Sequence, residues 1–284
     1  MKDQRCLFQE NGFPVPQLGM GTYMIEDYQL CKESVLTALK SGYRHIDTAQ
    51  IYKNEAAVGD ALAESGFPRE DVFLTTKLWV SNYSYDKAQG AIDNSIRKLK
   101  TDYIDLMLIH RPYGNYMPGW RALEDAVDAG KIRSIGISNF DEKQTAALLR
   151  KARIKPTVNQ IECHPYYQQN NLRQYLREMG ILVGAWYPLG HGDRKLLQNP
   201  LFAELAKKYG KSPVQVILRW HIQTENIVVP KSTNGKHLLD NRDIFDFTLS
   251  EEEMDRISML DENTSYFTTP LWLDELMARL FTRV

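Results

Sequence analysis

The chain has 284 residues, 43% of them hydrophobic, and its 35 Lys and Arg against 36 Asp and Glu leave a formal net charge of −1. A chain of this length buries a large core without disulfides or a structural metal. Its charge balance argues against a polybasic nucleic-acid or membrane-surface binder, and no apolar run reaches the ~18 residues of a membrane span.

The cysteines and the N-terminal residues bear on the cellular compartment. Cys6, Cys31 and Cys163 are few and widely spaced, so they predict neither a disulfide framework nor a cysteine-based zinc site. The first residues are polar and lead into no apolar signal core. We therefore expect a cytoplasmic protein, a monomer, with no metal ion.

In chain order, a small hairpin comes first and short apolar runs follow. The turn at Asn11-Gly12 predicts a hairpin over Cys6–Val15, which we place as a plug over the N-terminal mouth of the fold. Several of these runs are nearly continuous in Val, Ile and Leu, as in parallel strands that are buried on both faces. The eight runs are Leu18–Thr22, Arg44–Asp47, Val72–Lys77, Ile104–His110, Ile132–Ser138, Thr157–Glu162, Ile181–Tyr187 and Ile227–Lys231.

Amphipathic stretches separate these runs and predict helices. They include Asn54–Ser65, Asp86–Leu99, Asp141–Ala152 and a longer stretch, Leu201–Thr224, that is broken at Gly210 and Pro213. Strands that alternate with helices form parallel βαβ units. Eight such units without a linker predict a closed (β/α)₈ barrel (TIM barrel) as a single domain over residues 1–284. The tail from residue 265 to 284 has a helical spacing of apolar residues.

Chemistry in such a barrel belongs at the C-terminal ends of the strands. Asp47, Lys77 and His110 end three consecutive predicted strands, and Tyr52 follows Asp47 by five residues. A neighbouring lysine lowers the pKa of a phenol, a carboxylate keeps that lysine charged and oriented, and a neutral histidine can hydrogen-bond a carbonyl oxygen. The set can add a proton to a carbonyl oxygen, but it supplies no hydride, so a cofactor must do so.

The familiar nucleotide motifs are incomplete. Gly19-Met20-Gly21 lacks the third glycine of a dinucleotide fingerprint. Gly210-Lys211-Ser212 resembles the end of a phosphate loop, but Leu205 stands where that loop needs glycine. The segment Val229–Asn234 follows a strand and precedes a helix, so its backbone N–H groups are candidates to bind a phosphate.

These residues belong to a series of short motifs through which the chain resembles the aldo-keto reductases over nearly its full length. The motifs are Gly19–Tyr23, His45–Ala49, Tyr52–Glu55, Thr76–Trp79, Leu108–His110, Gly136–Phe140, Asn159–Tyr166, Trp186–Gly190 and Val229–Ser232. The resemblance implies a (β/α)₈ barrel that reduces aldehydes and ketones with a nicotinamide cofactor, usually NADPH.

The resemblance also implies roles for single residues. Tyr52 would donate the proton, Lys77 and Asp47 would tune the acidity of Tyr52, and His110 would orient the substrate carbonyl. Ser138, Asn139 and Gln160 would hold the nicotinamide carboxamide, Trp186 would stack on its ring, and Lys231, Ser232 and Thr233 would bind the 2′-phosphate. The cofactor set also includes Gly21, Thr22, Asp47, Tyr187, Leu189, His237 and Asn241, and the substrate set is Tyr23, Trp79, His110, Arg111 and Tyr113.

Further aromatic residues stand in or near the predicted mouth loops. They are Tyr116, Trp120, Phe267 and Trp272. Aromatic side chains in such loops can line a substrate pocket, and about half of them are expected only to pack loops onto helices.

Two departures from the family pattern affect the expected specificity. His237 stands where members that prefer NADP usually carry arginine, which weakens the implied preference. We therefore expect NADPH to be preferred less strongly than in those members, and NADH to be usable. Arg111 follows His110 where many members have tryptophan, so the pocket is less apolar. With its short loops after His110 and Leu189, the chain is similar to compact microbial reductases of sugar-derived ketones, keto acids and small dicarbonyls.

Two other functions remain open from the residues. Lys77 at a strand end could form a Schiff base with a carbonyl substrate, as in aldolases. Alternatively, the chain could be a regulatory barrel that binds the cofactor with little turnover.

Overall fold

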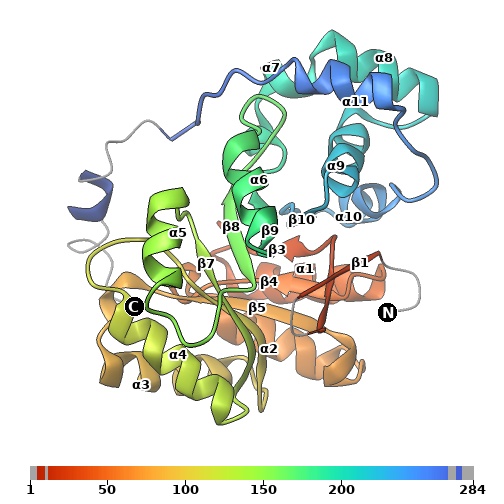
Figure 1. Cartoon of the computed structure of the whole chain (residues 1–284). Helices are drawn as coiled ribbons and strands as arrows, with labels where there is room; N and C mark the ends of the chain where they lie inside the picture. Colours follow the sequence, from red (N-terminus) through yellow and green to blue (C-terminus); the bar gives the residue numbers. More distant parts are fainter. Residues whose placement is uncertain (1–4, 10–11, 268–272, 277–284) are drawn as a thin grey trace.

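The computed structural model describes residues 5–9, 12–267 and 273–276, and its centre is a ring of eight parallel strands (Figure 1). Neighbours in the ring follow chain order: β3 (Met20–Gly21), β4 (His45–Asp47), β5 (Phe73–Leu78), β6 (Ile104–Ile109), β7 (Ile132–Ser138), β8 (Val158–Glu162), β9 (Leu182–Trp186) and β10 (Asn226–Val228). The ring closes where Leu18, just before β3, pairs in parallel with Val228 of β10. The predicted (β/α)₈ barrel is confirmed.

Helices connect successive strands and surround the barrel. They are α1 (Tyr28–Lys40), α2 (Glu55–Glu64), α3 (Tyr85–Lys98), α4 (Met117–Asp128), α5 (Glu142–Leu149), α6 (Asn170–Glu178), α7 (Arg194–Leu197), α8 (Pro200–Tyr209), α9 (Pro213–Gln223), α10 (Gly235–Arg242) and α11 (Glu251–Ser258). Short 3₁₀ turns are η1 (Gln50–Tyr52), η2 (Arg69–Asp71), η3 (Val80–Asn82) and η4 (Gly190–Gly192).

The predicted break in the long C-terminal helical stretch is present and has a clear cause. Gly210 ends α8 with a φ of +64°, a conformation that glycine adopts without strain. Ser212 then caps α9, exchanging hydrogen bonds with Gln215 in a capping box, and Pro213 occupies the first turn, where its missing N–H is not needed.

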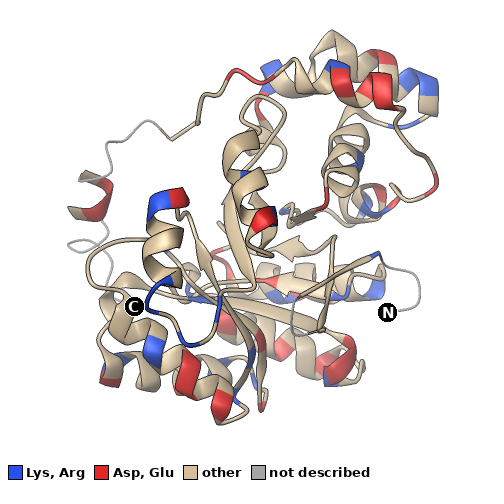
Figure 2. Ribbon diagram, viewed as in Figure 1, with Lys and Arg blue, Asp and Glu red and all other residues tan. Residues whose placement is uncertain are grey.

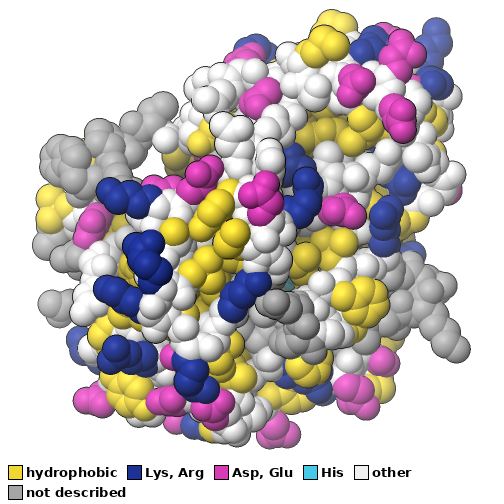
Figure 3. Space-filling view, in the orientation of Figure 1, with side chains coloured by type: hydrophobic (Ala, Val, Ile, Leu, Met, Phe, Trp, Pro, Cys, Tyr) yellow, Lys and Arg dark blue, Asp and Glu magenta, His cyan; other side chains and the backbone are white. Residues whose placement is uncertain are grey.

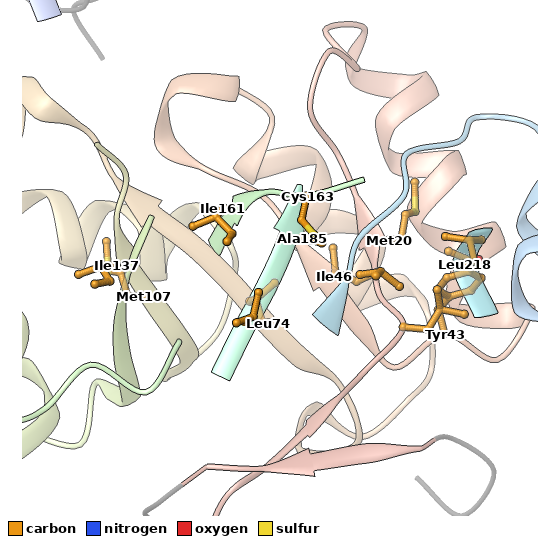
Figure 4. Packing of buried hydrophobic residues seen from close by; sticks show 14 of the residues in the cluster. Met20, Tyr43, Ile46, Leu74, Met107, Ile137, Ile161, Cys163, Ala185 and Leu218 are labelled. Atoms are coloured by element: carbon orange, nitrogen blue, oxygen red, sulfur yellow. The ribbon is translucent and has the colours of Figure 1, made fainter. Parts of the chain in front are cut away.

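Residues alternate between the two faces of the barrel strands, as the pleat of a strand requires. The outward set packs under the helices, and Figure 4 shows Ile46, Leu74, Met107, Ile137 and Ile161 of successive strands in this cluster. The inward set forms a separate cluster within the lower barrel, made of Phe73, Leu106, Leu108, Val158 and Ile227. Charged residues lie mainly on the helices and loops, and the strands are largely free of them (Figure 2).

The inward register continues to the C-terminal mouth, where the residues become polar or aromatic. His110 stands two residues beyond Leu108 of β6, and Gln160 stands two residues beyond Val158 of β8. On β5, Lys77 stands four residues beyond Phe73, with Thr75 at the inward position between them. The inward-facing residues of each strand therefore fill the lower barrel with apolar side chains and supply the polar groups of the C-terminal mouth.

The N-terminal hairpin is present. Strand β1 (Cys6–Phe8) pairs antiparallel with β2 (Pro14–Pro16), and Asn11 of the predicted turn lies outside the described residues. Val15 belongs to the same cluster as Phe73 and Val158, and Leu7 and Leu182 pack against that cluster. Phe73, Val158 and Leu182 are the first residues of β5, β8 and β9. The hairpin thus covers the N-terminal end of the barrel, as expected.

Several aromatic expectations need correction. Trp120 is fully buried on α4, where its indole N–H donates to Glu124 at 3.0 Å, so it does not reach the mouth. Tyr116 packs on Phe140 with ring centroids 5.0 Å apart. Of the predicted tail helix, residues 273–276 form a helical turn, and Trp272 lies outside the described residues.

Both signs of charge are spread over the face seen in Figure 3, in keeping with the small net charge. Among the described residues, none of the helices combines the length and hydropathy needed to cross a membrane.

Candidate active site

A cavity of about 560 Å³ opens at the C-terminal mouth of the barrel. Its floor contains Asp47, Tyr52 and His110, and its walls carry residues that follow β3, β5, β7, β9 and β10. The size falls within the usual range of small-molecule sites. The cavity is therefore the site at which the polar strand ends can act together.

Asp47, Lys77 and Tyr52 form a connected group at the floor. Lys77 Nζ lies 2.5 Å from Asp47 Oδ1 and 3.4 Å from the Tyr52 hydroxyl, and it also donates to the Thr48 carbonyl at 3.0 Å. Both charged side chains are almost fully buried, with exposed fractions of 1% for Lys77 and 3% for Asp47. A buried charge is stable only when paired and hydrogen-bonded, so the two residues form one unit.

The electrostatics of this group differ in one respect from the expectation. Burial favours the neutral form of Lys77, but Asp47 and Tyr52 outweigh that effect and raise its pKa above the ordinary value. Burial raises the pKa of Tyr52 as well, and Lys77 only partly opposes it, so the phenol is held protonated. The expected net lowering of the Tyr52 pKa is wrong, because desolvation exceeds the effect of the neighbouring cation.

His110 stands beside Tyr52 with ring centroids 5.8 Å apart in an edge-on arrangement, and Trp79 contacts its other side at 5.0 Å. Burial lowers the pKa of His110 well below its usual range, and the charges of Lys77 and Arg111 add to the effect. The imidazole is therefore neutral at physiological pH. Its Nδ1 atom is buried without a hydrogen-bond partner among the described residues, so it has donor or acceptor capacity unused within the protein.

A second polar group lies across the mouth on β7, β8 and β9. Ser138 Oγ donates to the Gln160 carbonyl at 2.9 Å, and Asn139 Nδ2 donates to Ser138 Oγ at 2.9 Å and to the His110 carbonyl at 3.2 Å. The Trp186 indole N–H donates to Asn139 Oδ1 at 2.8 Å. Asn139 adopts a positive φ of 65°, a conformation that asparagine tolerates well. These bonds fix the amide wall of the cavity beside an aromatic face.

Tyr187 follows Trp186 with a φ of +51°, which is unusual for a bulky residue. Its ring stacks on that of Phe267, with centroids 5.4 Å apart and 26° between the ring planes, and its centroid lies 4.6 Å from that of His191. Tyr23 from the first loop lies 6.1 Å from Tyr187 and 5.0 Å from Tyr52. These aromatic rings hold the strained backbone in place and roof the cavity.

The loop after β10 reaches the same cavity from the far side of the barrel. Lys231 lines the cavity, whereas Ser232 is buried and accepts a hydrogen bond from the Asn234 N–H at 3.1 Å. Asn234 caps α10 and accepts from the N–H groups of Lys236 and His237. This cap thus already uses some of the backbone N–H groups at the start of α10 that were expected to bind a phosphate.

Most predicted site residues meet at this cavity. Those that line it are Gly21, Tyr23, Asp47, Tyr52, Trp79, His110, Arg111, Ser138, Asn139, Gln160, Trp186, Tyr187, Leu189 and Lys231. Those that do not line it are Thr22, Lys77, Tyr113, Ser232, Thr233, His237 and Asn241. Lys77 lies directly behind Tyr52, and Thr22 is buried where its hydroxyl donates to the Asp47 carbonyl.

The sequence analysis missed several lining residues. They include Met24, Ile51, Pro188, His191, Gly192, Val229 and Pro230. Val229 and Pro230 stood inside the noted phosphate-loop segment and could have been assigned. Met24 lies in a turn of the first loop and His191 in the short 3₁₀ turn η4, and no periodicity in the sequence predicts either.

Comparison with known proteins agrees with this geometry. The model of the aldo/keto reductase family matches residues 17–262. A glyoxal reductase of Bacillus subtilis is 44% identical over 268 residues, which cover 94% of this chain and 95% of that protein. A 9,11-endoperoxide prostaglandin H2 reductase of Trypanosoma cruzi is 43% identical, covering 91% and 92% of the two chains.

Solved structures give the same result. An aldo/keto reductase from Brucella melitensis superposes with a TM-score of 0.87 at 44% identity, covering 91% of this chain and all of that one (100%). A Bombyx mori aldo-keto reductase in complex with NADP reaches a TM-score of 0.89 at 34% identity, covering 95% and 97%. With the barrel, the cavity and these matches together, the chain belongs to the aldo/keto reductase family of oxidoreductases.

Proposed function

We propose that the protein reduces an aldehyde or ketone with a nicotinamide dinucleotide and that Tyr52 donates the proton. The observation that carries the proposal is the contact of the Tyr52 hydroxyl with Lys77 at 3.4 Å, inside a cavity that also contains a neutral His110. General acid catalysis by a positioned side chain contributes typically 10²–10⁴-fold to a rate.

The residues present fit a nicotinamide cofactor. Hydroxyl and amide groups of Ser138, Asn139 and Gln160 line one wall next to the Trp186 indole, which suits a flat ring bearing a carboxamide. From there the cavity extends to Lys231, whose charge suits a phosphate. When bound, such a cofactor supplies the hydride that the protein side chains lack.

The protein's own groups account for the remaining steps. The substrate carbonyl oxygen is held between the Tyr52 hydroxyl and the His110 imidazole, and Tyr52 gives it a proton as negative charge develops on it. Lys77 stabilises the phenolate that remains, and Asp47 keeps Lys77 charged and in place. The aromatic roof of Tyr23, Tyr187 and Phe267 limits the entry of water.

The buried ion pair disfavours a Schiff-base mechanism. A lysine must lose its proton to attack a carbonyl, whereas Asp47 and Tyr52 raise the pKa of Lys77. Lys77 also lies behind Tyr52 and outside the cavity lining, so a substrate reaches the phenol first.

For the substrate we propose small dicarbonyls, keto acids or sugar-derived ketones, and for the cofactor a preference for NADPH. The B. subtilis relative is named a glyoxal reductase, and the B. mori structure is an NADP complex. The test is a panel of aldehydes, dicarbonyls and keto sugars assayed with NADPH and with NADH. We expect turnover with both and a higher kcat/KM with NADPH. No oxidation of either cofactor with any carbonyl would contradict the proposal and favour the regulatory barrel.

A further inference from the structure

Arg111 lies next to His110 in the chain, where the resemblance to the family leads one to expect tryptophan, and its backbone is held firmly. It follows His110 directly at the end of β6. Its N–H donates to the Tyr83 hydroxyl at 3.0 Å, and its carbonyl accepts from the same hydroxyl at 2.8 Å. The side chain lines the cavity and is 28% exposed. A residue with a cationic side chain is therefore anchored through its backbone next to His110, at the cavity.

The other charged residues of the cavity cannot take this place. Among the described lining residues, the charged side chains other than histidine are Asp47, Arg111 and Lys231. Asp47 is engaged with Lys77. Lys231 follows β10, four strands from β6 in a ring of eight, so it stands on the opposite side of the mouth. Arg111 therefore provides the positive charge at the carbonyl end of this lining.

The tail of the chain places a carboxylate at ion-pair distance from Arg111, without a close hydrogen bond between them. Asp274 Oδ2 lies 3.8 Å from the guanidinium, beyond the 2.7–2.9 Å of a charge-assisted hydrogen bond. The same carboxylate accepts a hydrogen bond from the Tyr113 hydroxyl, and Glu275 accepts from the Gly114 N–H at 3.0 Å. The space around Arg111 thus accommodates a carboxylate, while the five donors of a guanidinium keep capacity for another.

We propose that Arg111 forms an anion subsite next to Tyr52 and His110, which selects carbonyl substrates that carry a carboxylate. The inference rests on the proposed reduction and adds the substrate class. The substrate carboxylate bonds to the guanidinium of Arg111, while its carbonyl oxygen lies between Tyr52 and His110. Asp274 competes for the same guanidinium, so the helical turn at 273–276 weakens the subsite. The carboxylate itself is unchanged by the reaction.

The test compares 4-carboxybenzaldehyde with 4-carbamoylbenzaldehyde, two substrates that differ only in whether the ring carries a carboxylate or a neutral amide. The corresponding 3-substituted pair is compared in the same way. Each contains one reducible aldehyde, and only the first carries a negative charge. The measured quantity is the ratio of kcat/KM for the charged over the neutral aldehyde with NADPH. A hydrogen bond to a charged group corresponds to roughly a tenfold to hundredfold effect, so we expect Arg111→Gln to lower this ratio by at least tenfold.

Three further variants are compared with Arg111→Gln. Arg111→Lys keeps the charge without the guanidinium and should restore part of the ratio. Asp274→Asn keeps an acceptor for Tyr113 but removes the competing charge, so it should raise the ratio. Arg121→Gln removes an exposed arginine from α4, outside the cavity lining, and should leave the ratio unchanged. An unchanged ratio in Arg111→Gln, or a preference for the neutral aldehyde in the parent, would overturn the subsite.

A binding measurement separates this inference from the proposed reduction. Benzoate and benzamide are titrated into the parent and Arg111→Gln proteins by calorimetry, with NADP⁺ present and absent. Tighter binding of benzoate that disappears in Arg111→Gln supports the subsite even if no aldehyde is turned over, in which case only the proposed reduction fails. Equal binding of the two probes by the parent protein contradicts the subsite even if both aldehydes are reduced.

Discussion

Gln160 Nε2 donates a 2.8 Å hydrogen bond to Asp47 Oδ2 across the barrel mouth. The two residues belong to β8 and β4, which are four places apart in the ring of eight strands. Asp47 therefore has one oxygen on Lys77 and the other on the wall that we propose for the nicotinamide. The bond connects the proton-donating group with the cofactor wall.

This connection predicts a combined defect in Gln160→Met. The change removes the bond to Asp47 and one amide of the proposed cofactor wall, and a neutral hydrogen bond contributes about 0.5–1.5 kcal/mol. We expect the cofactor Kd to rise by up to roughly tenfold and kcat to fall as well. Fluorescence titration and steady-state kinetics measure the two effects. A normal kcat with a raised Kd would show that Gln160 does not help to position Asp47.

Asp47 and Lys77 should behave as one unit. Lys77→Met should abolish turnover even in a folded protein, because the phenol loses its cation. Asp47→Asn should cost less, because the Lys77 side chain stays beside the Tyr52 hydroxyl and keeps its hydrogen bond to the Thr48 carbonyl. In the double variant the losses should be far from additive, because residues in one hydrogen-bonded network depend on each other. Rate losses that simply add in this cycle would contradict the coupling.

The Lys231 loop should determine the cofactor preference. A lysine contact with the 2′-phosphate is worth ~1.5–3 kcal/mol, which is roughly tenfold to somewhat over a hundredfold in affinity. By the resemblance to the aldo-keto reductases, His237 stands where members that prefer NADP usually carry arginine, and an imidazole cannot make the two-pronged contact of a guanidinium. His237→Arg should tighten NADPH binding, and Lys231→Met should nearly remove the preference.

Dissociation constants for NADPH and NADH, measured on the parent and on the two variants, test this account. Equal affinity of the parent protein for both cofactors would show that the loop does not bind the 2′-phosphate.

His221 makes stability depend on pH. Burial lowers the pKa of His221 to about 3, against an ordinary value of 6.5. Between these values the unfolded chain binds one more proton than the folded one, so the free energy of unfolding falls as the pH falls below 6.5. The loss for one such group is about 1.4 kcal/mol per pH unit. His45 and His110, whose pKa values burial also lowers, add to it.

Urea unfolding at pH 7, 6 and 5 tests this sign. His221→Gln can keep the bonds to the Pro188 carbonyl and to Asn226, so it should unfold like the parent at pH 8 and lose less stability in acid. A slope identical to that of the parent would mean that His221 is not kept neutral by burial.

The barrel could be predicted from the sequence because each strand is short, apolar and followed by a turn. The alternation that places Lys77, His110 and Gln160 on the inward face is local, so the chain order of polar strand ends already indicates a shared mouth. Strand ends differ by a few residues, as in Leu18–Thr22 against the observed Met20–Gly21, because pairing, and not composition, decides where a strand stops.

What the sequence could not predict depends on contacts between distant loops. Tyr113, an expected substrate residue, donates a hydrogen bond to Asp274, 161 residues away in the chain, and does not line the cavity. The direction of the Tyr52 pKa depends on how completely the barrel buries the phenol. Neither quantity is encoded in a motif or a periodicity.

The most direct test of the account is the kinetics of Tyr52→Phe. The substitution removes the phenol oxygen and little volume, and the ring contacts with Tyr23 and His110 can remain. We predict that kcat falls by at least ~10²–10⁴-fold, while the Kd for NADPH stays within a few fold of the parent value. Turnover close to that of the parent, with the cofactor still bound, would contradict the assignment of Tyr52 as the proton donor.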